Sequence, residues 1–291
     1  MNAPPRLGFG VSGPLGRKWF SERRMAALVA AALDGGVRHF DTAPFYGDAQ
    51  ERLGRALRDA DARNVFVSTK TGTRREGRAV VKDFSERAIR RDVEESRIAL
   101  ARDSLDLLYL HGPTAGQTDA ARPVLDALMK EGAVKAIGVC GEGAAIARAI
   151  ETGFDAVMMI YNVIDRRNEA MFAEAKSRGL MNVAIGPLAQ GLFDPRFTAP
   201  RSLPDLWRLA RAGLRGRYAP ASVKAARAAL GDDAAARALG FVLANPSVDF
   251  VMTTTTKGPH LAASLAAAAR PIDPAIYEGL LSALDRNRGA S

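Results

Sequence analysis

The chain has 291 residues, of which 47% are hydrophobic and 25% are charged, a composition typical of a globular protein and unlike that of a disordered chain. The 41 Lys and Arg residues against 32 Asp and Glu give a formal net charge of +9, but these positive charges are spread along the chain, which argues against a nucleic-acid partner. The single cysteine, Cys140, cannot form an internal disulfide, and the sequence has neither a signal-peptide pattern nor an apolar run of membrane length, so we expect a cytoplasmic protein with no membrane partner.

Short apolar runs typical of buried strands alternate with longer stretches, rich in Ala, Arg and Glu, that are typical of amphipathic helices. The eight predicted strands cover residues 6–10, 37–41, 65–70, 105–111, 134–139, 156–160, 182–187 and 248–252. Ser21 and Ser85 precede helical stretches at positions where a serine hydroxyl can accept from first-turn amides. Eight strand-helix units predict an α/β protein, a (β/α)8 TIM barrel that occupies residues 1–291 as a single domain. A Rossmann sheet is disfavoured because no Gly-x-Gly-x-x-Gly follows the first strand.

A long connection at about residues 192–220 interrupts this repeat after the seventh predicted strand. It is rich in Pro and Arg and contains both Trp207 and Tyr218. Because loops at the carboxyl ends of barrel strands shape active sites, we expect this connection to form a wall or lid of the site rather than a solvated excursion. Three of its arginines hint at an anionic or sugar-like substrate: Arg201, Arg208 and Arg211.

Four polar residues fall at or just after the carboxyl ends of consecutive predicted strands. Asp41 ends the second strand, Tyr46 follows it, Lys70 ends the third strand and His111 ends the fourth. Parallel barrel strands open onto one face, so we expect these side chains to converge. Asp41 would hold Lys70, whose ammonium would lower the pKa of Tyr46, while His111 would donate to a substrate oxygen. A structural ion pair with unrelated Tyr and His residues is the alternative; His39 is expected to be structural.

Six motifs carry a resemblance to a known family. They are FDTAPFYG at 40–47, STK at 68–70, LDLLYLH at 105–111, GAVKAIG at 132–138, YN at 161–162 and GPLAQGL at 186–192. With these motifs, nearly the whole chain resembles the aldo-keto reductase superfamily. The resemblance implies a (β/α)8 barrel that transfers a hydride between NADPH and a carbonyl, with Asp41, Tyr46, Lys70 and His111 as its catalytic tetrad and Tyr46 as the general acid.

The resemblance also places a nicotinamide cofactor, NADP(H) first and NAD(H) second, and no metal. Its expected cofactor-binding residues are Pro187, Leu188, Gly191, Thr254, Thr255, Lys257 and His260. The threonines, Lys257 and the amino end of the following helix suit a phosphate. The chain departs from the common family pattern at Cys140, Gly141, Met158, Ile185, His260 and Ser264, and the loss of several hydrogen bonds would weaken NADPH binding.

Three functions remain open from the sequence. The first is a carbonyl reductase or alcohol dehydrogenase acting on a small aldehyde, ketone or sugar. The second is a redox-neutral isomerase, epimerase or dehydratase/lyase that keeps the tetrad, with Tyr46 as base, but has lost the nicotinamide cofactor. The third is a binding or regulatory protein that senses a nucleotide, against which the intact tetrad argues.

Overall fold

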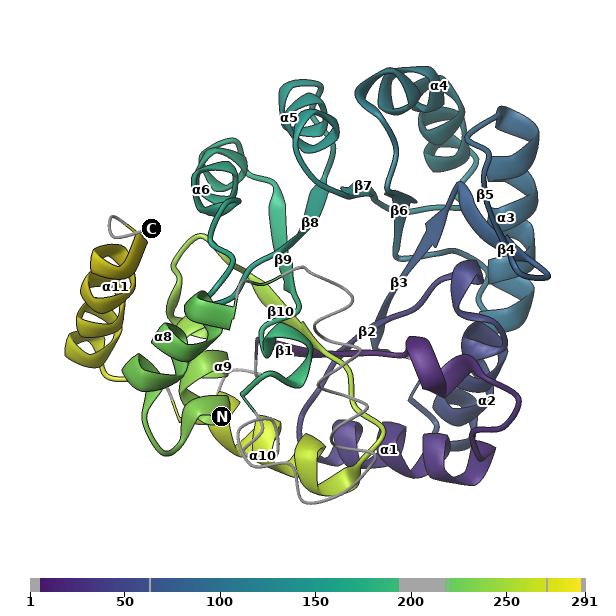
Figure 1. Cartoon of the computed structure of the whole chain (residues 1–291). Helices are drawn as coiled ribbons and strands as arrows, with labels where there is room; N and C mark the ends of the chain where they lie inside the picture. Colours follow the sequence, from purple (N-terminus) through teal and green to yellow (C-terminus); the bar gives the residue numbers. More distant parts are fainter. Residues whose placement is uncertain (1–5, 63, 194–217, 219, 271, 289–291) are drawn as a thin grey trace.

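The barrel predicted from the sequence is confirmed. The computed structural model describes residues 6–62, 64–193, 218, 220–270 and 272–288, in which eight parallel strands close in the order β1-β10-β9-β8-β7-β6-β3-β2 (Figure 1). These strands are β1 (Leu7–Gly10), β2 (His39–Asp41), β3 (Phe66–Thr71), β6 (Leu107–His111), β7 (Ile137–Cys140), β8 (Ala156–Ile160), β9 (Met181–Ile185) and β10 (Phe250–Thr253). Each lies within a few residues of its predicted counterpart.

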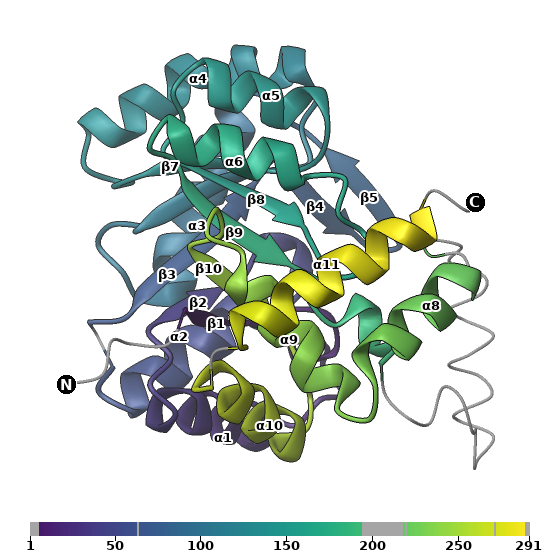
Figure 2. The same cartoon turned by 90° about the vertical axis from the view of Figure 1, so that its left-hand side faces the viewer.

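Helices surround the barrel (Figure 1). They are α1 (Glu22–Asp34), α2 (Ala49–Asp59), α3 (Glu86–Leu100), α4 (Ala115–Lys130), α5 (Ala144–Glu151), α6 (Glu169–Ser177), α8 (Pro220–Leu230), α9 (Ala234–Ala244), α10 (Gly258–Ala268) and α11 (Pro274–Arg288). The two serine caps are confirmed, because Ser21 accepts from the Arg24 amide and Ser85 from the Ala88 amide. Helix α11, which follows the last barrel unit, packs on α8 and α9 (Figure 2).

The barrel interior is apolar along β6 to β10 and polar at the ends of β2, β3 and β6. One buried cluster inside the barrel is apolar and is contributed mainly by β6 to β10; it comprises Leu107, Tyr109, Cys140, Ala156, Met158, Val183 and Met252. Parallel register places Asp41 beside Ser68, Lys70 beside Tyr109 and His111 beside Cys140. The polar strand ends of β2, β3 and β6 therefore lie side by side at one end of the barrel.

Two short strands, β4 (Thr73–Glu76) and β5 (Ala79–Lys82), form an antiparallel hairpin between β3 and α3. This hairpin was not predicted from the sequence, because all four residues of β4 are polar. The long connection expected at residues 192–220 falls largely outside the described residues, together with Trp207, Arg201, Arg208 and Arg211. Within the described parts of the chain, no helix is long and apolar enough to cross a membrane.

Candidate active site

A buried ion pair lies at the centre of the polar strand ends. Lys70 is 1% exposed, and its Nζ donates to Asp41 Oδ2 at 2.5 Å and to the Thr42 carbonyl at 2.9 Å. Ser68 Oγ donates to the other carboxylate oxygen of Asp41 at 2.9 Å. Burial opposes the charge on Lys70, but the charge of Asp41 and its hydrogen bond to Lys70 favour the ammonium, and the pKa of the lysine is raised. The ammonium is therefore charged at neutral pH and fixed in position.

Tyr46 is held beside this pair by a tight backbone approach. It ends the 3-10 turn η2 (Pro44–Tyr46), which begins with a proline and is followed by Gly47 at φ 69°. The Asp48 amide donates to the carbonyl of Gly16, in the 3-10 turn η1 (Gly13–Gly16), at 3.0 Å. A Cβ on Gly16 would lie 1.6 Å from the Tyr46 carbonyl oxygen, so only glycine permits this packing. The Lys70 Nζ lies 5.3 Å from the centre of the Tyr46 ring.

The direction of the Tyr46 pKa differs from the sequence prediction. Burial raises the pKa of Tyr46 to about 12, although the charge and hydrogen bonding of Lys70 act in the opposite direction. Lys70 thus acts in the predicted direction, but burial of the Tyr46 ring, which could not be read from the sequence, outweighs its effect. Tyr46 is thus a protonated phenol at neutral pH, which suits a proton donor.

The His111 ring packs beside Tyr46. The two ring centres are 5.9 Å apart, and Thr73 Oγ1 donates to the backbone carbonyl of His111 at 2.6 Å. Burial, followed by the charges of Lys70 and Lys82, lowers the pKa of His111 to about 3. A neutral imidazole carries one N–H, so His111 can donate a single hydrogen bond to an oxygen placed between its ring and Tyr46.

Two residues extend the polar group deeper into the barrel. His39 Nε2 lies 3.1 Å from Ser68 Oγ, which in turn donates to Asp41. The His39 ring packs edge-on against Phe66 and Phe250, and burial, with the charge of Lys70, lowers its pKa to about 3. His39 therefore supports Asp41 through Ser68. Sequence reasoning expected His39 to be structural but did not assign a role to Ser68.

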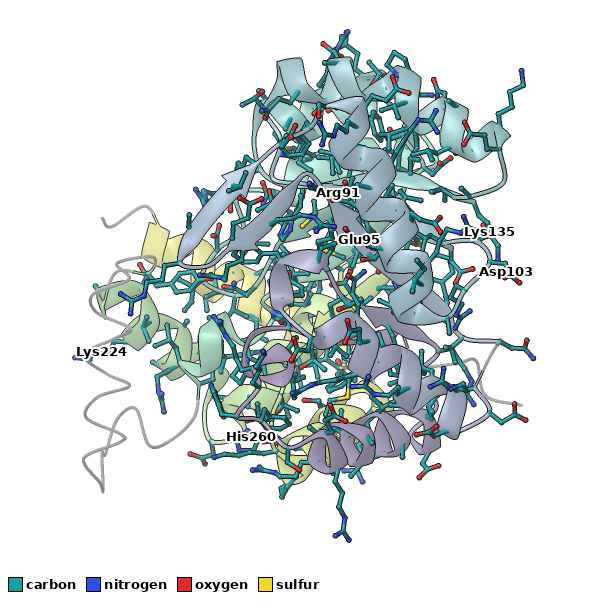
Figure 3. The ribbon with its side chains drawn as sticks, turned by 90° about the vertical axis from the view of Figure 1, so that its right-hand side faces the viewer. Arg91, Glu95, Asp103, Lys135, Lys224 and His260 are labelled. Atoms are coloured by element: carbon teal, nitrogen blue, oxygen red, sulfur yellow. The ribbon has the colours of Figure 1, made fainter. Side chains whose placement is uncertain are left out.

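The residues expected to bind the cofactor phosphates lie at the start of α10. Thr254 Oγ1 donates to the Gly10 carbonyl at 2.9 Å, and Thr255 Oγ1 accepts from the Lys257 amide at 3.2 Å. The first turn of α10 is exposed and contains no acidic residue. His260 lies in the lower part of the molecule in Figure 3, away from Lys135 and Asp103 at its right-hand edge. This end fits a phosphate.

Arg24, a cation that was not predicted from the sequence to bind the cofactor, lies beside the start of α10. Arg24 of α1 lies over the Phe20 ring at 5.1 Å, and its Nη2 donates to the Thr256 carbonyl at 3.3 Å. A sequence cannot show this contact, because the two residues belong to the first and last barrel units. Ser264, by contrast, is buried in α10 and donates to the His260 carbonyl at 3.0 Å.

The strand ends where the sequence departs from the family pattern offer few side-chain donors. Cys140 and Met158 are buried in the apolar cluster, where burial raises the pKa of the Cys140 thiol to about 11. Ile185 packs against the same cluster. Asn162 is committed internally, because its amide donates to the Gly186 carbonyl and Tyr218 hydroxyl and its oxygen accepts two backbone amides. A carboxamide here would depend on backbone groups.

The segment after β9 that was expected to contact the cofactor continues into a short turn. Pro187 is buried, Leu188 is half-buried, and the 3-10 turn η3 (Ala189–Gly191) follows directly. Gly191 has φ 85° and its amide donates to the Leu188 carbonyl at 2.8 Å. The described residues therefore present two candidate cofactor regions, this turn and the start of α10. No group of three or more His, Cys, Asp or Glu side chains suited to a metal occurs in the described part of the chain.

A parallel eight-stranded barrel with an acid-base cluster at its strand ends defines a class of barrel enzymes. A family model for the aldo/keto reductase family matches residues 6–283. The chain belongs to the aldo/keto reductase family.

Individual proteins are similar to parts or all of the chain. A D-threo-aldose 1-dehydrogenase from a Pseudomonas species is 34% identical over 192 residues, which cover 54% of this chain and 56% of that protein. An L-galactose dehydrogenase from Arabidopsis thaliana is 30% identical over 64% of this chain and 62% of its own length. The matches thus span less than two thirds of each of these two relatives. The holo form of an aldo-keto reductase from Bacillus halodurans superposes with a TM-score of 0.81 at 25% identity, covering 96% of this chain and 91% of that one.

Proposed function

We propose that this protein is an NAD(P)H-dependent carbonyl reductase or alcohol dehydrogenase acting on a small aldehyde, ketone or sugar. The observation that carries the proposal is the buried Asp41–Lys70 pair beside Tyr46 and His111. Membership of the aldo/keto reductase family supports it. The names of two relatives, an aldose dehydrogenase and a galactose dehydrogenase, favour a sugar or a sugar-like carbonyl compound.

The chain's own residues account for the proton in this reaction. A reduced nicotinamide, held by the turn after β9 and the start of α10, would provide the hydride for the carbonyl carbon. His111 donates a hydrogen bond to the carbonyl oxygen and polarises it. As the C=O π bond opens, Tyr46 transfers its phenolic proton to that oxygen and completes the alcohol. The charged Lys70, held by Asp41, stabilises the phenolate that Tyr46 leaves behind.

NADP(H) is the first choice of cofactor in this proposal and NAD(H) the second. The α10 amino terminus and Lys257, with Arg24 beside them, provide positive potential for a phosphate. Thr254, Thr255 and His260 flank this position. At the other end, Pro187, Leu188 and Gly191 would hold the cofactor mainly through backbone and apolar contacts.

A redox-neutral enzyme is the second candidate, and the apolar Cys140 and Met158 favour it because they offer no amide partner to a carboxamide. This alternative needs Tyr46 as a base. The pKa of Tyr46, raised to about 12 by burial, suits the proton donor that carbonyl reduction requires.

A fluorescence titration with NADPH, and separately with NADH, tests the proposal. We expect saturable binding in the micromolar range, followed by nucleotide oxidation when aldehydes and aldoses are added. The absence of binding at millimolar nucleotide would overturn the reductase proposal and leave the redox-neutral candidate. Nucleotide binding without turnover of any carbonyl compound, or of any alcohol with the oxidised nucleotide, would instead indicate a nucleotide-sensing protein.

A further inference from the structure

The β4–β5 hairpin has two chemically different faces. Thr73 pairs directly with Lys82, and Arg75 pairs directly with Val80. Directly opposed residues of an antiparallel pair share one face, and neighbours along a strand alternate between faces. One face therefore carries these four residues, and Arg74 belongs to the other face.

The Arg74 face fixes the hairpin to α3. Arg74 Nε donates to Asp92 at 2.5 Å, and its Nη2 pairs with Glu95. Asp92 also accepts from the Thr71 hydroxyl at 2.8 Å and the Gly72 amide at 3.0 Å, just before β4 begins. Figure 3 shows Glu95 on the part of α3 that lies beside the hairpin. The hairpin is thus anchored at its base by a partly buried charge network.

The opposite face contacts the acid-base residues. Thr73 Oγ1 donates to the His111 carbonyl, and Lys82 Nζ donates to the carbonyl of the next residue, Gly112, at 2.6 Å. The Arg75 guanidinium lies over the Phe45 ring, with its carbon 4.9 Å from the ring centre. The Phe45 ring in turn contacts Tyr46 and His111, at 5.9 and 5.7 Å between ring centres.

The charges on this face are not neutralised within the described residues. Arg75 and Lys82 are both exposed, and neither has an ion pair with a described carboxylate. Other arginines of the surface differ, since Arg90 and Arg148 each contact two carboxylates. Lys82 keeps further N–H donors after its bond to Gly112, and Arg75 keeps the full guanidinium edge, because cation–π contact uses only its face.

We propose that Arg75 and Lys82 bind an acidic group of the substrate, a carboxylate or a phosphate ester, while Tyr46 and His111 take its carbonyl oxygen. This proposal rests on the proposed carbonyl reductase function and names its substrate class. A planar guanidinium suits either anion through paired hydrogen bonds, and an ammonium adds a point charge. The arginines expected from the sequence to attract an anion, Arg201, Arg208 and Arg211, lie outside the described residues, and the two cations of this proposal lie on the hairpin.

Matched pairs of substrates test the proposal. For a carboxylate, the pair is 4-carboxybenzaldehyde and its uncharged amide, 4-carbamoylbenzaldehyde; for a phosphate, it is glyceraldehyde 3-phosphate and glyceraldehyde. We expect the wild-type protein to prefer the charged member of at least one pair about tenfold in kcat/KM. The pair that shows the preference identifies the acidic group.

Two variants remove the proposed contacts. Arg75→Gln and Lys82→Gln should each lower the charged-to-neutral ratio of kcat/KM by about tenfold, mainly by raising KM for the charged member. The control is Arg78→Gln, which removes the same charge from the hairpin turn at a residue outside both faces' contacts; its ratio should stay within twofold of wild type. Raising the ionic strength should also reduce the wild-type preference.

Two results would overturn the proposal: no preference for either charged substrate in the wild type, or an equal loss in the Arg78→Gln control. If no carbonyl is reduced at all, the proposed function fails first, and the hairpin is tested by calorimetric binding of 4-(hydroxymethyl)benzoate and glycerol 3-phosphate. Weaker binding of either anion to Arg75→Gln than to Arg78→Gln would still support the anion site, and equal binding would reject it.

Discussion

At the ends of β2 and β3 the polar side chains are hydrogen-bonded to one another, with the His111 ring at the end of β6 packed against Tyr46 beside them, whereas at the ends of β7, β8 and β9 the inward side chains are apolar. Asp41 holds Lys70 at 2.5 Å, while Cys140 and Met158 pack within an apolar cluster. On the first side, which we call the acid-base side, hydrogen bonds among Asp41, Ser68 and Lys70 fix the positions of the side chains without a ligand. The second side has to recognise its ligand through backbone groups and shape. The acid-base chemistry and the cofactor contacts of this barrel can therefore change independently.

Replacing Tyr46 tests the acid-base side most severely. Tyr46→Phe removes the proposed proton donor but keeps the ring that contacts His111, so we expect kcat/KM for carbonyl reduction to fall by about 10³-fold. Nucleotide affinity should stay within twofold, since the hydroxyl is no cofactor anchor in this proposal. Steady-state kinetics and fluorescence titration of the same preparation measure both. Retention of a tenth of the activity would exclude Tyr46 as the acid.

Gly16→Ala asks whether the acid-base side depends on backbone packing. The added Cβ would meet the Tyr46 carbonyl oxygen at 1.6 Å, so the turn carrying Tyr46 must move by about 1 Å or more. A displacement of this size can cost about 10²-fold in turnover. The matched control is Gly116→Ala on α4, where no atom lies within 4 Å of the new Cβ. Equal kcat in the two variants would contradict the positioning role of Gly16.

The strands and the four polar residues at their ends could be predicted from the sequence, whereas the contacts that surround these residues and shift their pKa values could not. Eight buried strands and two serine caps could be predicted because apolar runs and capping residues are local signals. The hairpin was missed although Gly77, at φ 60°, marks its turn, because Arg and Glu in β4 hide the strand pattern. The rise in the Tyr46 pKa depends on burial, and the Arg24 contact joins distant barrel units. Neither leaves a local signal.

The pH dependence of stability tests whether His39 is neutral in the folded protein, as its burial beneath Asp41 and Ser68 implies. The folded pKa of His39 is lowered to about 3, whereas an unfolded histidine titrates near 6.5, so the unfolded chain binds more protons between these values. The free energy of unfolding should therefore fall as pH drops below 6.5. His39→Gln should reduce this slope by about 1 kcal/mol per pH unit between pH 6 and 5. His111, whose pKa is also lowered to about 3, stays in both proteins and maintains part of the slope.

Urea unfolding at a series of pH values measures these slopes. The pH range above 5 is chosen because most carboxylates titrate lower. If the free energy of unfolding depends on pH equally in His39→Gln and the wild type, His39 is protonated in the folded protein. Its contact with Ser68 would then be a hydrogen bond donated by a charged imidazolium. A smaller slope in His39→Gln than in the wild type would mean that His39 is neutral in the folded protein and belongs to the hydrogen-bonded group of Ser68 and Asp41.

The cofactor side can be altered toward the family pattern at one position without disturbing the barrel. Gly141 has no positive φ, and a Cβ there would meet only ordinary van der Waals contacts, the nearest at 3.7 Å. Gly141→Asn therefore adds a side-chain amide next to Cys140 with little strain. One new hydrogen bond to the nicotinamide carboxamide is worth about 1 kcal/mol, or roughly fivefold in NADPH affinity.

Met158→Gln provides the contrast, because Met158 is 1% exposed in the apolar cluster. A buried amide without a partner costs about 1 to 3 kcal/mol, so this variant should lose stability in the free protein, and this cost should cancel the hydrogen bond that the amide could give the carboxamide, leaving NADPH affinity unchanged. Fluorescence titration with NADPH, beside thermal unfolding, separates the two effects. Tighter binding in Gly141→Asn alone would show that the cofactor side lacks only a donor within reach. An unchanged NADPH affinity would mean that backbone groups already form the hydrogen bonds of the carboxamide. The apolar side chains at these strand ends would then not weaken cofactor binding.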